Sequence, residues 1–272
     1  MRSTAAQTIL IPVGTDYLRC LRWGQGSRVV IALHGFSRSA ETYVPMGQTL
    51  PVDTVLYAPD LPFHGPEVWN AQSFTPQDMV EVVHHILEKE NTEHYYLVGF
   101  SLGARLCWKM LPLLRELPQR LLVIAPDGLN TKFLSKLAGS PRWLNKVVHR
   151  WAQNPERFAE RLARWRKRGL PVGYLENFVL YGTQNPRLRT LFYGVGKSLP
   201  DLRVRRRRLK KFLRTSELPV RVVLGRYDPV IPLTAADTLR DLPNVSVTVI
   251  DANHRIVAPG RGEFLWKQVF TA

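Results

Sequence analysis

Ser101 has the sequence setting best suited to nucleophilic chemistry in this chain. It lies in Gly99-Phe100-Ser101-Leu102-Gly103, which matches the GxSxG pattern directly after a predicted strand and directly before a predicted helix. In that context the serine occupies a strained turn, and the flanking glycines remove Cβ atoms that would collide with the neighbouring strand and helix. Because a helix start presents free N–H groups, the Leu102 amide is predicted to bind a developing oxyanion.

A second oxyanion donor is predicted in the turn His34-Gly35-Phe36, which ends an earlier buried strand. An oxyanion site of this kind takes one N–H from the residue after the nucleophile and another from a loop after a neighbouring strand. Phe36 is therefore the candidate for the second amide. The side chain of His34 is expected to have a structural role.

A carboxylate and a histidine follow two later predicted strands. Asp228 comes directly after one of them, and His254 follows the last strand, 26 residues further on. The carboxyl ends of parallel strands share one edge of a sheet, so both residues are expected near Ser101. His254 would act as general base, and Asp228 would accept its imidazole N–H and orient it. Asp127, at the end of another strand, is the alternative acid, and Asp228 could instead only cap a helix near Pro232.

The remaining histidines and the cysteines give no metal or redox signature. His84 and His85 are adjacent on a predicted helix and cannot share a face as ligands. His64 is expected to hold its own loop. Cys20 and Cys107 form no CxxC pair, so both are expected to be buried and reduced. We therefore expect neither a metal nor an organic cofactor.

Hydrophobic periodicity predicts alternating strands and helices, which is typical of an α/β protein with a mostly parallel, doubly wound sheet. The first two strands are predicted to form a hairpin. Strands are predicted at 8–12, 17–23, 28–35, 54–60, 94–100, 121–128, 220–225 and 245–251, and helices near 40–50, 76–90, after Ser101, near 233–241 and near 260–270.

Residues 130–217 interrupt this alternation and are predicted to form an inserted helical cap, with the core at 1–129 and 218–272. Apolar residues recur there at helical spacing: Trp143, Val147 and Trp151; Phe158, Leu162 and Trp165; Leu202, Leu209 and Leu213. Residues 130–215 carry 22 Lys and Arg against 4 acidic residues, and this accounts for the net charge of +16 of the 272-residue chain. The insertion is therefore predicted to meet an anionic substrate or partner, although such charge runs are often only solvated helix faces.

Taken together, HGF (34–36), DLPFHG (60–65), GFSLG (99–103), GRYDPVIP (225–232) and NH (253–254) resemble the α/β-hydrolase superfamily. This resemblance extends over almost the whole chain. It implies an α/β-hydrolase fold with a helical cap and a Ser101, Asp228, His254 triad. Asp251 and Asn253 stand before His254 where relatives often have glycine. The motifs are not specific for a substrate.

The expected function is hydrolysis of an ester or thioester through an acyl-enzyme. The basic insertion suggests an anionic substrate such as acyl-CoA, an acidic acyl carrier protein or a lipid. Carbon–carbon bond hydrolysis or lyase chemistry on the same scaffold is an alternative. A non-enzymatic protein that binds an anionic membrane surface or nucleic acid is a further one, but the complete triad argues against it, and nucleic acid is not the expected partner. No apolar run suits a signal peptide or a membrane span, so a cytoplasmic location is expected.

Overall fold

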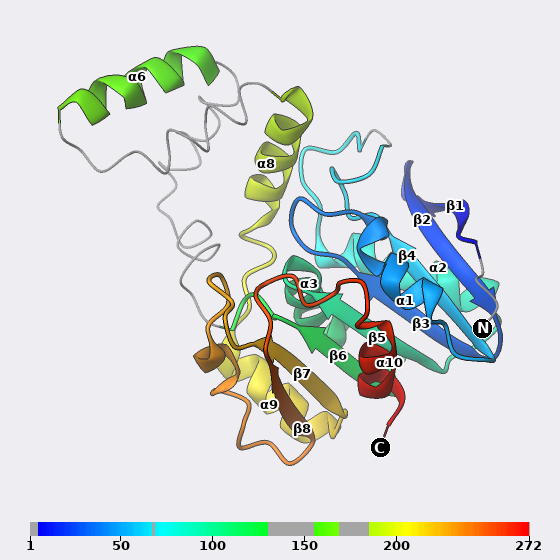
Figure 1. Ribbon diagram of the computed structural model, residues 1–272. Helices are drawn as coiled ribbons and strands as arrows, with labels where there is room; N and C mark the ends of the chain where they lie inside the picture. The colour runs from blue at the N-terminus through cyan, green and yellow to red at the C-terminus, as the bar shows by residue number, and fades with distance from the viewer. Residues whose placement is uncertain (1–4, 67–68, 130–154, 169–184, 272) are drawn as a thin grey trace.

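In the described part of the chain, the strands form one central eight-stranded sheet, in the order β1-β2-β4-β3-β5-β6-β7-β8 (Figure 1). The computed structural model describes residues 5–66, 69–129, 155–168 and 185–271. β1 pairs with β2, and β2 with β4, in antiparallel fashion, and the remaining pairs are parallel. The strands are β1 (Gln7–Val13), β2 (Asp16–Gln25), β3 (Arg28–Leu33), β4 (Thr54–Pro59), β5 (Tyr95–Phe100), β6 (Arg120–Ile124), β7 (Val220–Gly225) and β8 (Val245–Ile250). This confirms the opening hairpin and the mostly parallel sheet.

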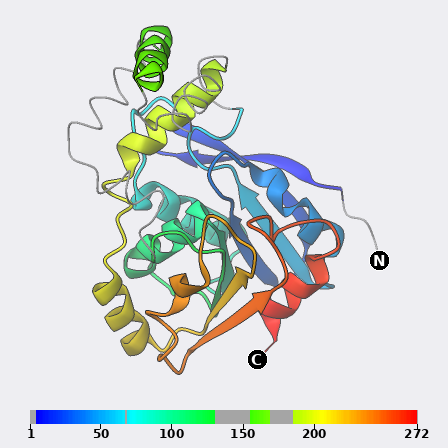
Figure 2. The same cartoon turned by 60° about the vertical axis from the view of Figure 1, so that its left-hand side comes forward.

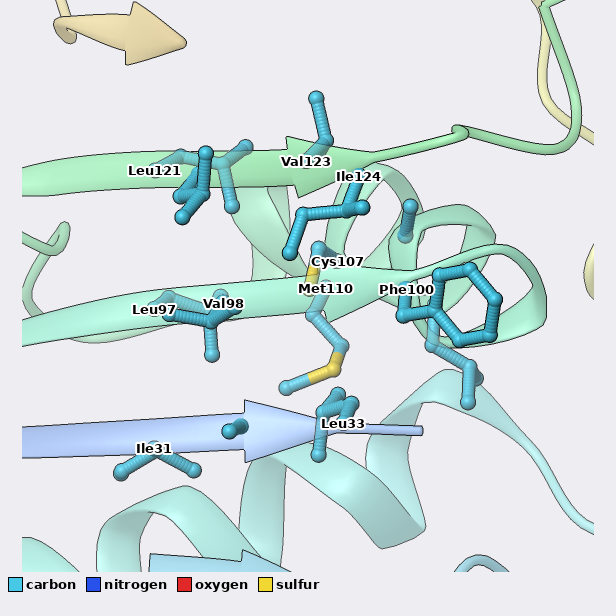
Figure 3. Packing of buried hydrophobic residues seen from close by; sticks show 14 of the residues in the cluster. Ile31, Leu33, Leu97, Val98, Phe100, Cys107, Met110, Leu121, Val123 and Ile124 are labelled. Carbon is cyan, nitrogen blue, oxygen red and sulfur yellow. The ribbon is translucent and has the colours of Figure 1, made fainter. Parts of the chain in front are cut away.

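The central strands are continuous apolar runs because helices cover both of their faces. All six residues of β4 are buried, and so are all but the first of β3 and β6. Figure 3 shows how side chains from three neighbouring strands meet those of α3 (Leu102–Met110). The labelled residues of this layer are Ile31, Leu33, Leu97, Val98, Phe100, Cys107, Met110, Leu121, Val123 and Ile124.

Helices lie on both sides of the sheet, as expected for a doubly wound fold (Figures 1 and 2). On one side α1 (Val44–Gln48), which follows the short helix η1 (Ala40–Tyr43), packs against α10 (Gly262–Phe270). On the other side α2 (Pro76–Lys89) packs against α3, which continues into η2 (Leu111–Leu113). α2 begins with a capping box, in which the Thr75 hydroxyl accepts from the Asp78 amide and the Asp78 carboxylate accepts from the Thr75 amide.

The prediction of a helix near 233–241 was wrong in its length. Only the short helix η3 (Leu233–Ala236) forms there, and turns follow it. The Leu239 amide donates to the Ala236 carbonyl and the Leu242 amide to the Leu239 carbonyl, so successive bonds span three residues rather than four. Both leucines are buried. An apolar spacing of three is met equally well by this tight turn path, and periodicity alone does not separate the two.

Three described helices lie within 155–216: α6 (Pro155–Lys167), α8 (Pro186–Ser198) and α9 (Arg206–Ser216). In Figure 1, α8 and α6 lie beyond the carboxyl ends of the parallel strands, whereas α9 lies beside β7 and β8. Leu202, Leu209 and Leu213 are buried in the core, and Leu162 is buried whereas Trp165 is exposed. Trp143, Val147 and Trp151 lie outside the described residues. The division into a core and a cap at 130–217 stays a prediction.

Both cysteines are buried and free, in agreement with the sequence-based expectation. Burial raises the pKa of the Cys20 and Cys107 thiols well above its usual value. Such thiols are poor nucleophiles, because the thiolate is the reactive form. Among the helices of the described ranges, none combines the length and the apolar character that a membrane crossing requires.

Candidate active site

Ser101 lies at the junction of β5 and α3 in a conformation that is unusual for a serine, with φ 52° and ψ −110°. Its amide donates to the Ile124 carbonyl at 2.9 Å, which ties the turn to β6. The two flanking glycines permit the close packing. A Cβ on Gly99 would lie 2.6 Å from the Ala104 Cα, and a Cβ on Gly103 would lie 2.0 Å from the Leu33 carbonyl oxygen. The turn is therefore wedged between α3 and the end of β3.

Asp228 and His254 form a direct hydrogen bond at the carboxyl ends of β7 and β8. His254 Nδ1 lies 2.7 Å from Asp228 Oδ2, and the Asp228 side chain is fully buried. Asp228 Oδ1 accepts from the Val230 and Ile231 amides at 2.8 and 2.9 Å. Burial raises the pKa of Asp228, but the bonds from His254 and from the two amides outweigh it, so the pKa lies below its usual value. The carboxylate is thus held ionised, with one oxygen fixed and the other directed at the imidazole.

His254 also lies beside the strand that leads to Ser101. The centroid of its ring is 5.2 Å from that of Phe100, and about a quarter of its side chain is exposed. Within the described part of the chain, no hydrogen bond joins His254 to Ser101. The structure therefore brings the hydrogen-bonded Asp228 and His254 and the Ser101 turn to one sheet edge, while the Ser101–His254 contact and the triad stay predictions.

Asp127, the alternative acid, is engaged elsewhere. Its carboxylate accepts from Arg105 Nε and Nη2 at 2.9 and 3.0 Å, and Oδ1 also accepts from the Gly128 amide at 2.7 Å. Both side chains of the ion pair are buried. The amides of Arg105 and Asp127 donate to the Ser101 carbonyl at 3.1 and 3.3 Å. Asp127 therefore supports the backbone of the Ser101 turn, and among the described residues it forms no hydrogen bond or ion pair with His254.

The turn His34-Gly35-Phe36, called the oxyanion loop below because it is predicted to supply the second oxyanion donor, comes close to Ser101. A Cβ on Gly35 would lie 3.2 Å from the Ser101 Cβ, so the turn that carries Phe36 passes directly beside Ser101. Among the described residues, neither the Phe36 amide nor the Leu102 amide donates a hydrogen bond. Two free N–H groups next to the nucleophile are what an oxyanion hole requires.

His34 holds this loop through both ring nitrogens. The Leu61 amide donates to Nε2 at 2.9 Å, so the proton of the neutral ring is on Nδ1, which lies 2.8 Å from the Gly35 carbonyl oxygen. Burial lowers the pKa of His34 to about 4, which keeps the ring neutral near pH 7. The structural role expected for His34 thus has a definite form: it fixes the carbonyl directly before the Phe36 amide.

Asp60 is a buried supporting residue that the sequence analysis did not single out. Its carboxylate accepts from the Ala40 amide at 2.6 Å and from Arg19 Nε at 2.7 Å, and it lies 3.7 Å from His34 Nε2. Arg19 in turn binds Glu41 with two hydrogen bonds. The position of Asp60 directly after β4, in the motif DLPFHG, was the available signal.

A polar pocket of about 250 Å³ borders the oxyanion loop and the start of α8. Arg38 and Arg187 line it together with His64, which is buried and has no hydrogen-bond partner at Nε2. His64 Nδ1 lies 2.9 Å from the Pro62 carbonyl oxygen, in agreement with a loop-holding role. Arg187 donates to the Gly65 carbonyl at 2.6 Å. The two arginines beside the site were not predicted, since only the fold brings 38 and 187 together.

The other histidine pair lies away from this edge. His84 Nε2 accepts a long hydrogen bond of 3.4 Å from the Arg115 amide, at the far end of α2 and α3. Burial lowers the pKa of His84. Within the ranges that the structure describes, no group of three His, Cys, Asp or Glu side chains is placed to hold a metal ion.

Comparison with known proteins identifies the family. A sequence model of the alpha/beta hydrolase family matches residues 30–263, which include all three triad candidates. The chain belongs to the α/β-hydrolase family. It is also 29% identical over 146 residues to a protein of Drosophila melanogaster described as a probable serine hydrolase. That match covers 52% of this chain and only 44% of the fly protein.

Solved structures share the fold at low sequence identity. A serine hydrolase from Cycloclasticus zankles superimposes with a TM-score of 0.66 at 16% identity, over 96% of this chain and 95% of that one. A thermophilic esterase from Thermogutta terrifontis gives 0.66 at 18% identity, over 97% and 96%. The thioesterase domain of the curacin biosynthetic pathway gives 0.64 at 14% identity, over 96% and 98%. These similarities confirm the predicted α/β-hydrolase fold.

Proposed function

We propose that this protein is a serine hydrolase that cleaves a carboxylic ester or thioester through an acyl-enzyme. Ser101 is the nucleophile, His254 the general base, and Asp228 the carboxylate that orients His254. The amides of Phe36 and Leu102 form the oxyanion hole. The observation that carries the proposal is the strained Ser101 turn at the same sheet edge as the 2.7 Å bond between His254 and Asp228.

The chemistry follows from the roles of these groups. His254 Nε2 takes the Ser101 hydroxyl proton as Oγ attacks the acyl carbonyl, and the two amides stabilise the oxyanion. Asp228 stabilises the imidazolium that forms. The tetrahedral intermediate collapses to the acyl-enzyme as His254 returns the proton to the departing alcohol or thiol. Water, activated by the same histidine, then releases the acid and restores Ser101.

An anionic substrate, such as acyl-CoA, an acyl carrier protein or a lipid, is supported by the charge beside the oxyanion loop. Arg38 and Arg187 line the polar pocket there, and Arg38 forms no ion pair with any described residue. A negatively charged group on the substrate would gain from both guanidinium groups. If this is correct, KM for an acyl-CoA should rise with salt and in Arg38→Gln, whereas KM for p-nitrophenyl acetate should not. Equal salt dependence for both substrates would contradict it.

Labelling with a fluorophosphonate probe, read by intact mass, tests the nucleophile directly. The wild-type protein should gain one adduct, and Ser101→Ala should gain none. Ser246→Ala is a matched control, because Ser246 lies on the exposed face of β8 in the same sheet. It should label as the wild type does. An adduct of undiminished yield on Ser101→Ala would refute the assignment.

Turnover separates the substrate classes. A p-nitrophenyl ester should give a burst of one equivalent if the acyl-enzyme accumulates. Parallel panels of acyl esters and acyl thioesters then show which leaving group is preferred. Carbon–carbon bond cleavage, non-enzymatic binding and the cytoplasmic location stay predictions that no observed contact favours. Absence of turnover and of labelling, together with binding to anionic vesicles, would favour the non-enzymatic alternative.

A further inference from the structure

A second, larger pocket of about 610 Å³ lies on the α3 and α9 side of the sheet. Its described lining comes from the last turn of α3, from the connection between α8 and α9, and from the first turns of α9, segments that Figure 2 shows running past one another. Four cationic residues line it: Lys109, Arg203, Arg205 and Arg208. Asp201 is the single acidic residue among the described lining.

A buried donor without an acceptor lies in this wall. Trp108 is only 3% exposed and lines the pocket, and its Nε1–H has no hydrogen-bond partner among the described residues. Leaving such a group unpaired costs free energy, because the hydrogen bond to water is lost on burial. The Nε1 atom itself has almost no solvent-accessible area, so the indole is part of the pocket wall and does not reach a bound molecule directly.

The first turn of α9 adds backbone donors. Arg205 is the N-cap residue and provides no side-chain cap, so the N–H groups of the next three residues have no acceptor within the helix. The helix dipole places partial positive charge at the same end. Helix starts of this kind bind phosphate and other anions.

The cations at the pocket are free to bind, unlike Lys210 and Arg214 further along the helix. Within the described ranges, Arg203, Arg205 and Arg208 make no ion pair, whereas Lys210 and Arg214 are paired with Asp241. Burial lowers the pKa of Lys109; Asp201 opposes this and Arg205 adds to it. Bound negative charge would offset both the cost of burying the Lys109 ammonium group and its repulsion from Arg205.

We infer that this pocket binds a small phosphate-bearing molecule at a site separate from the catalytic edge. The guanidinium groups, the Lys109 ammonium and the helix start are all donors, and phosphate oxygens are all acceptors. Leu209 and Phe212 supply apolar wall beside them, so the ligand has an organic part next to its phosphate. Trp108 follows Ser101 by seven helical residues, which places the site roughly 10 Å further along α3.

Calorimetry with inorganic pyrophosphate and with AMP tests the site on the full-length protein. Binding is expected for both, and Arg205→Gln/Arg208→Gln should weaken it by about tenfold or more. Arg206→Gln/Arg207→Gln is the matched control, because it removes the same charge from the same turn but from residues outside the lining. Equal weakening in the two double variants would mean diffuse attraction and would overturn the proposal. Ser101→Ala should bind as the wild type does, so the outcome is independent of the proposed activity.

Two further measurements test the place of binding and the source of the phosphate. The indole N–H signal of Trp108, assigned by its loss in Trp108→Phe, should shift on titration with pyrophosphate, while the other indole signals stay in place. An unmoved Trp108 signal would refute binding in this pocket. Vesicles with and without phosphatidylglycerol provide the lipid arm. Binding to anionic vesicles without binding of pyrophosphate or AMP would overturn a soluble phosphate-bearing ligand in favour of a membrane headgroup.

Discussion

Replacing Gly103 by alanine tests how tightly the nucleophile turn is built. The added Cβ would lie 2.0 Å from the Leu33 carbonyl oxygen and 2.7 Å from that of His34, whereas ordinary contacts begin near 3.4 Å. The first helical turn must therefore move away from β3 by about 1.4 Å. This movement separates the Leu102 amide from the Phe36 amide, which directly follows the crowded segment.

The expected cost has two parts. Crowding a packed interior destabilises a protein by about 1–3 kcal/mol, and a displacement of about 1 Å at a catalytic group lowers the rate by about 100-fold. We expect Gly103→Ala to show both effects, in urea unfolding and in kcat for a p-nitrophenyl ester. The loss in kcat should exceed any rise in KM, because the oxyanion donors act mainly in the transition state.

Gly196→Ala is the matched control for this substitution. Gly196 lies within α8, and an added Cβ there would meet no atom within 4 Å. The control should leave kcat unchanged and raise the free energy of unfolding by about 0.4–1 kcal/mol, since alanine restricts the unfolded chain. If Gly103→Ala keeps wild-type activity and stability, the close contact between Gly103 and the end of β3 does not position the oxyanion donors.

Three other substitutions or conditions have expected outcomes. Asp228→Asn should lower kcat by about 10³–10⁴-fold with little change in Tm, because the amide favours the wrong histidine tautomer; a loss below tenfold would contradict the assigned role. Arg105→Met should lower the free energy of unfolding by about 3–5 kcal/mol in urea, since it leaves the Asp127 carboxylate buried without its partner. Burial lowers the pKa of His34 to about 4 and that of His64 to about 3. Below about pH 6.5 these histidines therefore bind protons in the unfolded chain but not in the folded one, so the free energy of unfolding should fall from there towards pH 4. In His64→Phe the free energy of unfolding should fall less steeply with pH. An identical slope in the variant and the wild type would refute this account.

The strands were predictable because each is a short apolar run that ends in a turn residue. The Ser101 turn was predictable for a related reason: GxSxG satisfies a steric demand that is local to one strand and one helix. The choice between Asp228 and Asp127 was not local. It depends on Arg105, which lies opposite Asp127 only once α3 has packed against β5. The presence of Arg38 and Arg187 at one pocket and the unpaired indole N–H of Trp108 likewise arise from tertiary packing, which periodicity and motif spacing do not reveal.

The register between β6 and β7 has a consequence for how this chain tolerates change. Leu121 faces Val220 across that pair, so two adjacent strands close a chain loop of nearly a hundred residues that contains 130–217. The entropy of closing a flexible loop grows only with the logarithm of its length, and doubling the length costs about 0.6 kcal/mol. Lengthening, shortening or exchanging this segment therefore changes the cost of bringing β6 and β7 together very little. Specificity can diverge there while the sheet that carries Ser101, Asp228 and His254 keeps its geometry.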